Sequence, residues 1–246
     1  MEVTPETIVA NLTSVRERLA AAHAALAPDA RLPAPTLIAV SKTKPTPLLQ
    51  AAYDAGQRDF GENYVQEVVE KAPALPPDVR WHFIGHLQTN KVKDLVAVPN
   101  LFCVHTVDSL KLANELQKRT AALRPDRPLE VMVQVNTSAE ESKSGCAPTE
   151  CLALCSELVA SCPLLSLRGL MCIGKYSSAE GVADEDFACL VACRQQVAAM
   201  LKLDPSTLAL SMGMSHDFEV ATRAGSTHVR VGSTIFGARQ PKLPTA

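Results

Sequence analysis

Short apolar runs alternate with segments of helical periodicity along most of this chain. The apolar runs predict buried strands at residues 37–41, 58–60, 81–84, 101–106, 129–135, 166–171, 207–211 and 228–231. Between them, the periodicity predicts helices at 46–55, 62–71, 90–97, 108–120, 148–160, 184–202 and 216–224, with a last short helix after Gly232. Eight strands that alternate with helices without a clear break predict a single α/β domain, the (β/α)₈ or TIM barrel.

A further helix is expected before the barrel. Apolar residues recur at helical spacing over 5–27, and a segment containing Pro28, Pro33 and Pro35 follows. We therefore expect one domain over 1–246, composed of an N-terminal helix and linker (1–36), the barrel (37–239) and a tail (240–246).

The main alternative fold is a doubly wound parallel sheet. Such a sheet usually carries a glycine-rich GxGxxG turn after its first strand. The first strand here is followed by SKTKPTP, which has no glycine. The barrel is therefore the favoured fold.

Composition narrows the classes of function. The chain has 246 residues, of which 47% are hydrophobic, and its formal net charge is −2. This length and apolar content support one large core, and the weak acidity argues against bulk binding to nucleic acid or to an anionic membrane. No run of about 18 apolar residues predicts a membrane span, and the first residues resemble no targeting signal. We expect a cytoplasmic protein.

The eight cysteines all follow residue 102. The pairs Cys151/Cys155 and Cys189/Cys193 have the i,i+4 spacing that places both members on one helical face. Metal binding is conceivable, but no CxxC motif or histidine cluster accompanies them. We expect reduced thiols buried in the core and no metal site.

Lys42 is the first candidate for chemistry, because it follows the apolar run 37–40 at the end of the first strand. In this fold, active sites lie at the carboxyl ends of the strands. A lysine there is either a solvated charge or an amine whose burial lowers its pKa and makes it a nucleophile toward carbonyl groups. Lys44 lies next to Pro45, and we expect it at the rim of such a site.

The ends of the last two strands predict a phosphate site. The loops after strands seven and eight form the usual phosphate site of this fold. Here they offer the hydroxyl group of Ser215 and the backbone N–H groups of Gly232 and Ser233, at the start of a predicted helix. Gly232 carries no Cβ that would block a phosphate.

Several other polar or soft residues have two interpretations. Arg230 lies among valines in strand eight and faces either the barrel interior or the helices. His82 is expected to be a hydrogen-bonded core histidine, whereas His86 lies past a strand end and could reach a pocket. The methionines of the seventh strand end, Met212 among them, favour packing, although one could line a wall against a ring.

Five separated segments then show a family resemblance in the same order along the chain. AVSKTKP, FGENYVQE, WHFIGHLQ.NK, LSMGMS.D and VR.GS.IFG together resemble the pyridoxal 5′-phosphate homeostasis protein family, over residues 37–239. The segments NTS.EESK.G and CP.L...GLM are similar to its eukaryotic members.

The resemblance implies a barrel similar to the N-terminal domain of alanine racemase. It implies pyridoxal 5′-phosphate (PLP) held as a Schiff base on Lys42, with Ser215, Gly232 and Ser233 holding the phosphate. By the same resemblance Arg230 would face the pyridine nitrogen, and Asn63 would lie near the ring. Met212 completes the set of cofactor-binding residues that we expect, as a wall against that ring.

The resemblance also implies a carrier, present as a monomer, that buffers PLP and delivers it to client enzymes with little catalytic turnover. Two enzyme alternatives stay open. The first is an amino-acid racemase, for which Tyr64 is the nearest candidate for a second base. Only nine residues follow Gly237, so we expect no second β domain of the racemase kind. The second is a Schiff-base aldolase or phosphosugar isomerase that uses Glu62 as its acid or base.

Overall fold

Eight parallel strands close into a barrel in the computed structural model, which describes residues 3–26, 33–138, 140, 143–174 and 182–238. Each strand pairs with its neighbours in chain order, and β1 pairs with β8. The strands are β1 Thr36–Val40, β2 Asp59–Glu62, β3 Arg80–Phe83, β4 Leu101–Val107, β5 Leu129–Val135, β6 Leu165–Cys172, β7 Ala209–Ser211 and β8 His228–Val231. The predicted (β/α)₈ barrel is confirmed.

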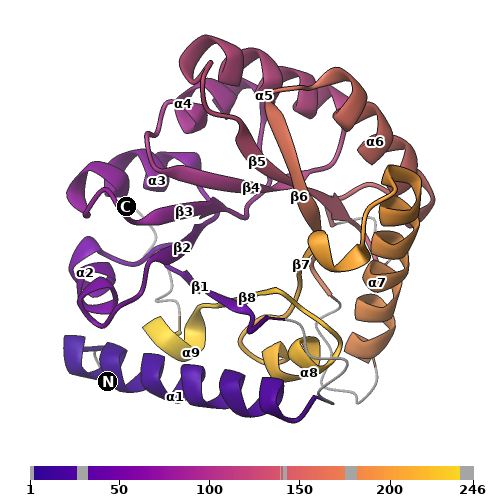
Figure 1. The fold of residues 1–246 in the computed structure, drawn as a ribbon. Helices are drawn as coiled ribbons and strands as arrows, with labels where there is room; N and C mark the ends of the chain where they lie inside the picture. Colours follow the sequence, from indigo (N-terminus) through magenta and orange to yellow (C-terminus); the bar gives the residue numbers. More distant parts are fainter. Residues whose placement is uncertain (1–2, 27–32, 139, 141–142, 175–181, 239–246) are drawn as a thin grey trace.

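Helices form a ring outside the strands (Figure 1). They are α2 Thr46–Asp54, α3 Val65–Lys71, α4 Val92–Val96, α5 Leu110–Leu123, α6 Pro148–Ser161, α7 Val182–Leu201, α8 Phe218–Arg223 and α9 Ser233–Phe236. Short 3₁₀ turns lie at Ala72–Ala74, Thr89–Lys91 and Pro205–Thr207. Within the described residues, no helix combines the length and the apolar character that a membrane span needs.

The extra N-terminal helix, α1 Pro5–Ala24, lies across α2, α8 and α9 (Figure 1). Its N-cap residue, Thr4, accepts a hydrogen bond from the amide of Thr7. Its inner face is buried through Ile8, Leu12 and Val15. The predicted linker at 28–36 falls largely outside the described residues, and the predicted tail at 240–246 lies wholly outside them.

The second strand differs from its predicted extent. The structure continues β2 to Glu62 and begins α3 at Val65, whereas the periodicity predicts a helix from residue 62. Glu62 pairs with Phe83 in the sheet, and its side chain is fully buried. Because Glu62 is charged, the pattern alone predicts a helix start there. In the structure, buried hydrogen-bond partners keep Glu62 in the strand.

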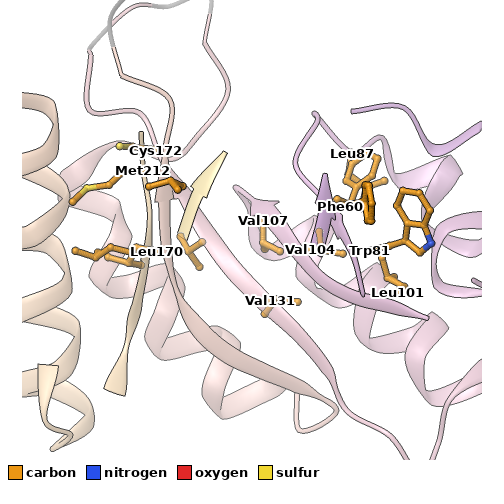
Figure 2. Close-up of a cluster of buried hydrophobic side chains, with 14 of the residues drawn as sticks. Phe60, Trp81, Leu87, Leu101, Val104, Val107, Val131, Leu170, Cys172 and Met212 are labelled. Carbon is orange, nitrogen blue, oxygen red and sulfur yellow. The ribbon is translucent and has the colours of Figure 1, made fainter. Parts of the chain in front are cut away.

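The main core fills the space between the strands and the helices, where Phe60, Trp81 and Leu101 pack together (Figure 2). Val131 and Val133 belong to this layer, so Met132 between them faces the barrel interior. Met132 there joins a smaller buried cluster with Cys103, Met171 and Ala209. The described cysteines are free thiols, and seven of the eight are buried, with Cys189 partly exposed.

Candidate cofactor site at the carboxyl ends of the strands

One cavity of about 350 Å³ lies over the carboxyl ends of β1, β2, β7 and β8. Six of the seven predicted site residues line it: Lys42, Asn63, Ser215, Arg230, Gly232 and Ser233. Lys44, Met214 and His216 line it as well, with apolar walls from Val40, Ile84 and Ile173. The fold therefore brings together residues that are up to 191 positions apart in the chain, from 42 to 233.

Met212 is the exception among the predicted residues. It is fully buried in the main core (Figure 2). Met214 lines the cavity in its place. Gly213 between them has φ +92°, a left-handed conformation that ends the strand alternation and redirects the chain. The expectation that Met212 lines the cavity is therefore corrected to Met214.

The segment around Lys42 is held by hydrogen bonds on both sides. The Ser41 amide donates to the carbonyl of Gly61 at 3.0 Å, and its hydroxyl donates to Glu62 Oε1 at 2.6 Å. The Thr43 amide donates to Glu67 Oε2 at 2.8 Å, and Thr43 itself has φ +63°. Because residues 41 and 43 are fixed, the backbone of Lys42 has a defined position at the mouth of the barrel.

A buried ion pair below this segment supplies the anchor. Lys71 Nζ donates to Glu62 Oε1 at 2.7 Å and to the carbonyl of Ser41 at 2.9 Å, and it also contacts Glu67. Burial raises the pKa of Glu62 to about 7, against the opposing effects of Lys71 and Ser41. Glu62 points toward α3 and is absent from the cavity lining. The sequence analysis missed Lys71 and Glu67, whose only signal is their i,i+4 spacing on α3.

Arg230 is the most deeply buried charge of the site, with 4% of its surface exposed. Its strand neighbours Val229 and Val231 pack in the main core between the strands and the helices, so Arg230 between them faces the barrel interior. Its Nη1 donates to Ser211 Oγ and its Nη2 to the carbonyl of Cys172, both at 2.8 Å. Within the described part of the chain no carboxylate forms an ion pair with it, so a buried cation faces the cavity with neutral partners only.

The ends of β7 and β8 meet at Ser215 and Gly232. The amide of Gly232 donates to Ser215 Oγ at 3.1 Å. A Cβ at residue 232 would lie 3.2 Å from both the Cβ and the carbonyl oxygen of Val40, so this position is tight for any side chain. Ile235 and Phe236 donate their amides to the Gly232 carbonyl, which forms the first turn of α9. The amides of Ser233 and Thr234 precede these bonds, as the first N–H groups of any helix do.

Asn63 contributes an unsatisfied polar atom. Its Oδ1 is buried and has no hydrogen-bond partner among the described residues. Buried polar oxygens without a partner are rare, and at a cavity wall they indicate a missing ligand or water.

Burial also lowers the pKa of Lys44, whose Nζ donates to the carbonyl of Ala238 at 3.0 Å at the edge of the cavity.

His82 in β3 and His86 just after it lie in different surroundings, and only the prediction for His82 is confirmed. His82 is fully buried and hydrogen-bonded on both ring nitrogens, which confirms its place in the core. His86 lies 3.2 Å from Ser144 Oγ and 3.8 Å from Asp108, in a separate surface pocket. It is therefore outside the candidate site.

Comparisons with known proteins agree with this fold. The model of the family "Alanine racemase, N-terminal domain" matches residues 10–240. The human pyridoxal phosphate homeostasis protein is 46% identical over 242 residues, which cover 95% of this chain and 88% of the human one. The protein of the same name from Pseudomonas aeruginosa is 42% identical and covers 98% of this chain and 99% of its own.

A solved structure is similar as well. PipY of Synechococcus elongatus, with PLP bound, superposes with a TM-score of 0.68 at 35% identity, over 90% of this chain and 99% of that one. The resemblance that five short segments indicated therefore extends over nearly the whole chain. The chain belongs to the pyridoxal phosphate homeostasis protein family, built on the barrel of the alanine racemase N-terminal domain.

Proposed function

We propose that this chain binds PLP as a Schiff base on Lys42 and takes part in cofactor homeostasis by holding PLP and delivering it to client enzymes. The observation that carries the proposal is the single cavity in which Lys42, Arg230 and the Ser215–Gly232 contact converge. PipY, a relative at 35% identity, is similar over 90% of this chain and has PLP bound.

The residues present fit such a cofactor on three observations. The buried cation of Arg230 has no ion-pair partner in the described residues and suits a neutral ring nitrogen with a lone pair. A Cβ at Gly232 would lie 3.2 Å from the Cβ and the carbonyl oxygen of Val40, so the position suits glycine, whose backbone a phosphate can approach without meeting a side chain. The buried Oδ1 of Asn63 has no hydrogen-bond partner among the described residues, and a polar ligand or a water bound with it can supply one.

Each residue then has a role that its chemistry supports. Bound PLP supplies an aldehyde that condenses with a primary amine. Lys42 provides that amine, and the amides at the start of α9, with Ser215, bind the phosphate. Arg230 cannot release its proton at ordinary pH, so it keeps a facing pyridine nitrogen unprotonated. An unprotonated ring withdraws electrons weakly, which favours storage over carbanion chemistry.

The placement of acids and bases favours a carrier over the enzyme alternatives. Glu62, the acid of the aldolase alternative, is engaged by Lys71 and Ser41 outside the cavity. Tyr64 is 54% exposed and does not line the cavity. Tyr53 donates to Asp78 at 2.6 Å, and Tyr176 lies outside the described residues.

The test is the visible spectrum of the purified protein with added PLP, before and after borohydride reduction, followed by peptide mapping. We expect a band near 420 nm, typical of pyridoxal Schiff bases, that disappears on reduction and leaves a pyridoxyl group on Lys42. Lys42→Ala should lack the band while Lys44→Ala keeps it. A stable adduct on Lys42→Ala, or no band in the wild-type protein, would overturn the proposal.

Delivery needs a separate measurement. Protein loaded with PLP and freed of excess cofactor is mixed with an apoenzyme that depends on PLP, and the recovery of that enzyme's activity is followed. We expect faster recovery than with the same concentration of Lys42→Ala treated in the same way. Equal rates would restrict the function to storage.

A further inference from the structure

A single file of polar side chains crosses the interior of the barrel and ends at the candidate site. His82 Nε2 lies 2.9 Å from Asp59 Oδ1, and His82 Nδ1 lies 2.9 Å from His105 Nε2. His105 Nδ1 lies 3.0 Å from Ser211 Oγ, which in turn accepts from Arg230 Nη1 at 2.8 Å. The five residues come from β2, β3, β4, β7 and β8, and each is buried.

The charge at the far end sets the direction of these hydrogen bonds. Although burial alone would raise the pKa of Asp59, hydrogen bonds from His82 and Arg80 hold it below its ordinary value, so this carboxyl is ionised. Arg80 donates to both of its oxygens. Since an ionised carboxylate only accepts, His82 must donate through Nε2, and a ring with that single proton has Nδ1 as an acceptor.

The same reasoning applies to His105, the next residue of the file. His105 donates from Nε2 to His82, so its Nδ1 accepts the hydroxyl proton of Ser211. Burial, together with the positive charges that His82 and His228 carry when protonated and that of Arg230, holds the pKa of His105 well below its ordinary value, which keeps its ring neutral. The proton of Ser211 is thereby committed to His105, and a lone pair of its oxygen is directed at Arg230.

The opposite direction satisfies the groups less well. If His82 carried a second proton, its Nδ1 would donate to His105, and His105 would donate to Ser211 Oγ. Ser211 would then accept from both His105 and Arg230, and its own proton would need a further acceptor. Within the described residues, Ser211 Oγ makes no other hydrogen bond that supplies one.

We propose that Ser211, His105 and His82 are positioning residues that hold the Arg230 guanidinium toward the pyridine nitrogen of the cofactor. This inference rests on the proposed function. Two guanidinium nitrogens are fixed, one by the end of the file and the other by the carbonyl of Cys172. The remaining N–H donors of Arg230 have no hydrogen-bond partner among the described residues and can face the cavity that Arg230 lines. Linked hydrogen bonds in a buried site polarise one another, so the carboxylate of Asp59 supports the arginine across the barrel.

The first test uses the cofactor-free protein and does not depend on the proposed function. Nitrogen-15 NMR of labelled histidine side chains reports which ring nitrogen carries the proton. We expect neutral rings protonated on Nε2 for both His82 and His105. A His105 ring protonated on Nδ1, or on both nitrogens near neutral pH, would overturn the proposed direction and with it the positioning role.

The second test compares PLP with its 1-deaza analogue, in which a C–H group replaces the pyridine nitrogen while the aldehyde and phosphate remain. Wild-type protein should bind PLP more tightly than the analogue. Ser211→Ala should reduce this preference by about tenfold, because a hydrogen bond to a charged group is lost. His105→Phe should act in the same direction, since it removes both ring nitrogens at similar size.

His228→Asn is the matched control. His228 is a third buried histidine of the barrel; its ring lies beside those of His82 and His105 without a hydrogen bond to either, and it hydrogen-bonds to Thr227 Oγ1 at 2.8 Å. We expect this variant to keep the full preference for PLP, which would separate positioning from general damage to the interior.

The outcomes distinguish the two proposals. Binding of neither compound by the wild-type protein would overturn the proposed function and this inference with it. Equal binding of both compounds by the wild-type protein would overturn the proposal that Arg230 faces the pyridine nitrogen, but not the proposed PLP site on Lys42. A full preference retained in Ser211→Ala would overturn the positioning role alone.

Discussion

Gly85 packs directly against the backbone of Asn63: a Cβ added at residue 85 would lie 2.0 Å from the Asn63 carbonyl oxygen. No side chain fits at that distance, so the loop after β3 supports the loop after β2 only because residue 85 is glycine. This contact sets the position of Asn63 at the cavity wall.

Gly85→Ala should therefore displace Asn63 and destabilise the protein. We expect a loss of about 2 kcal/mol in unfolding free energy, or a fall in Tm of roughly 4–8 °C, with weaker PLP binding. Gly174→Ala is the control, because its added Cβ meets its nearest atom at 3.5 Å. Equal thermal shifts in the two variants would contradict the special role of Gly85.

Glu62 should make stability depend on pH. Its folded-state pKa of about 7 lies above the ordinary value of 4.5, so the folded protein binds more protons than the unfolded chain between these values. Its contribution to stability is present below about pH 4.5 and is lost as the pH rises through about 7. Relative to Glu62→Gln, the wild-type protein should lose roughly 3 kcal/mol across this window.

The measurement is urea unfolding at several pH values, followed as the difference between the two proteins. Glu70→Gln is the control, because Glu70 is exposed on α3. Parallel pH curves for wild type and Glu62→Gln would show that Glu62 is ionised normally in the folded state.

A negative charge at Ser233 should repel the cofactor phosphate. We expect Ser233→Asp to weaken PLP binding by about tenfold or more, because two like charges a few ångströms apart in a partly buried site interact strongly. Ser156→Asp adds the same charge on the exposed face of α6 and should leave affinity unchanged. Titration of the absorbance band with PLP measures the affinity of both variants. Unchanged affinity in Ser233→Asp would mean that the phosphate does not bind beside residue 233.

The N-terminal helix should be part of the folded core. Leu12 is fully buried in the face that α1 presents to the barrel, whereas Val9 on the same helix is 43% exposed. Leu12→Ala should cost about 3 kcal/mol, as buried leucine truncations do, and Val9→Ala less than about 0.5 kcal/mol. Thermal unfolding checks this difference, and similar small shifts would mean that α1 is not coupled to the barrel.

Local pattern was sufficient for the architecture. The alternation of apolar runs with helical periodicity predicts eight strands and the helix that precedes them, because burial on one face imposes a period on the sequence. It also placed Lys42, Asn63, Ser215, Arg230, Gly232 and Ser233 at strand ends, where this fold gathers its site. The pattern was wrong about the start of α3, since a buried ion pair leaves no periodic signal. For Met212 the packing that the pattern favours is confirmed, and only its expected place in the cavity wall is wrong.

Only the tertiary structure decided which polar residues meet. Arg230 was equally compatible with the interior and the exterior of the barrel, and the pairing of β8 with β1 turned it inward. Asp59, His82, His105 and Ser211 are far apart in the sequence and become a continuous file only when the barrel closes. Sequence periodicity shows which residues of a strand share a face. Strand register decides which of them meet on the inner face, and only the closed sheet specifies that register.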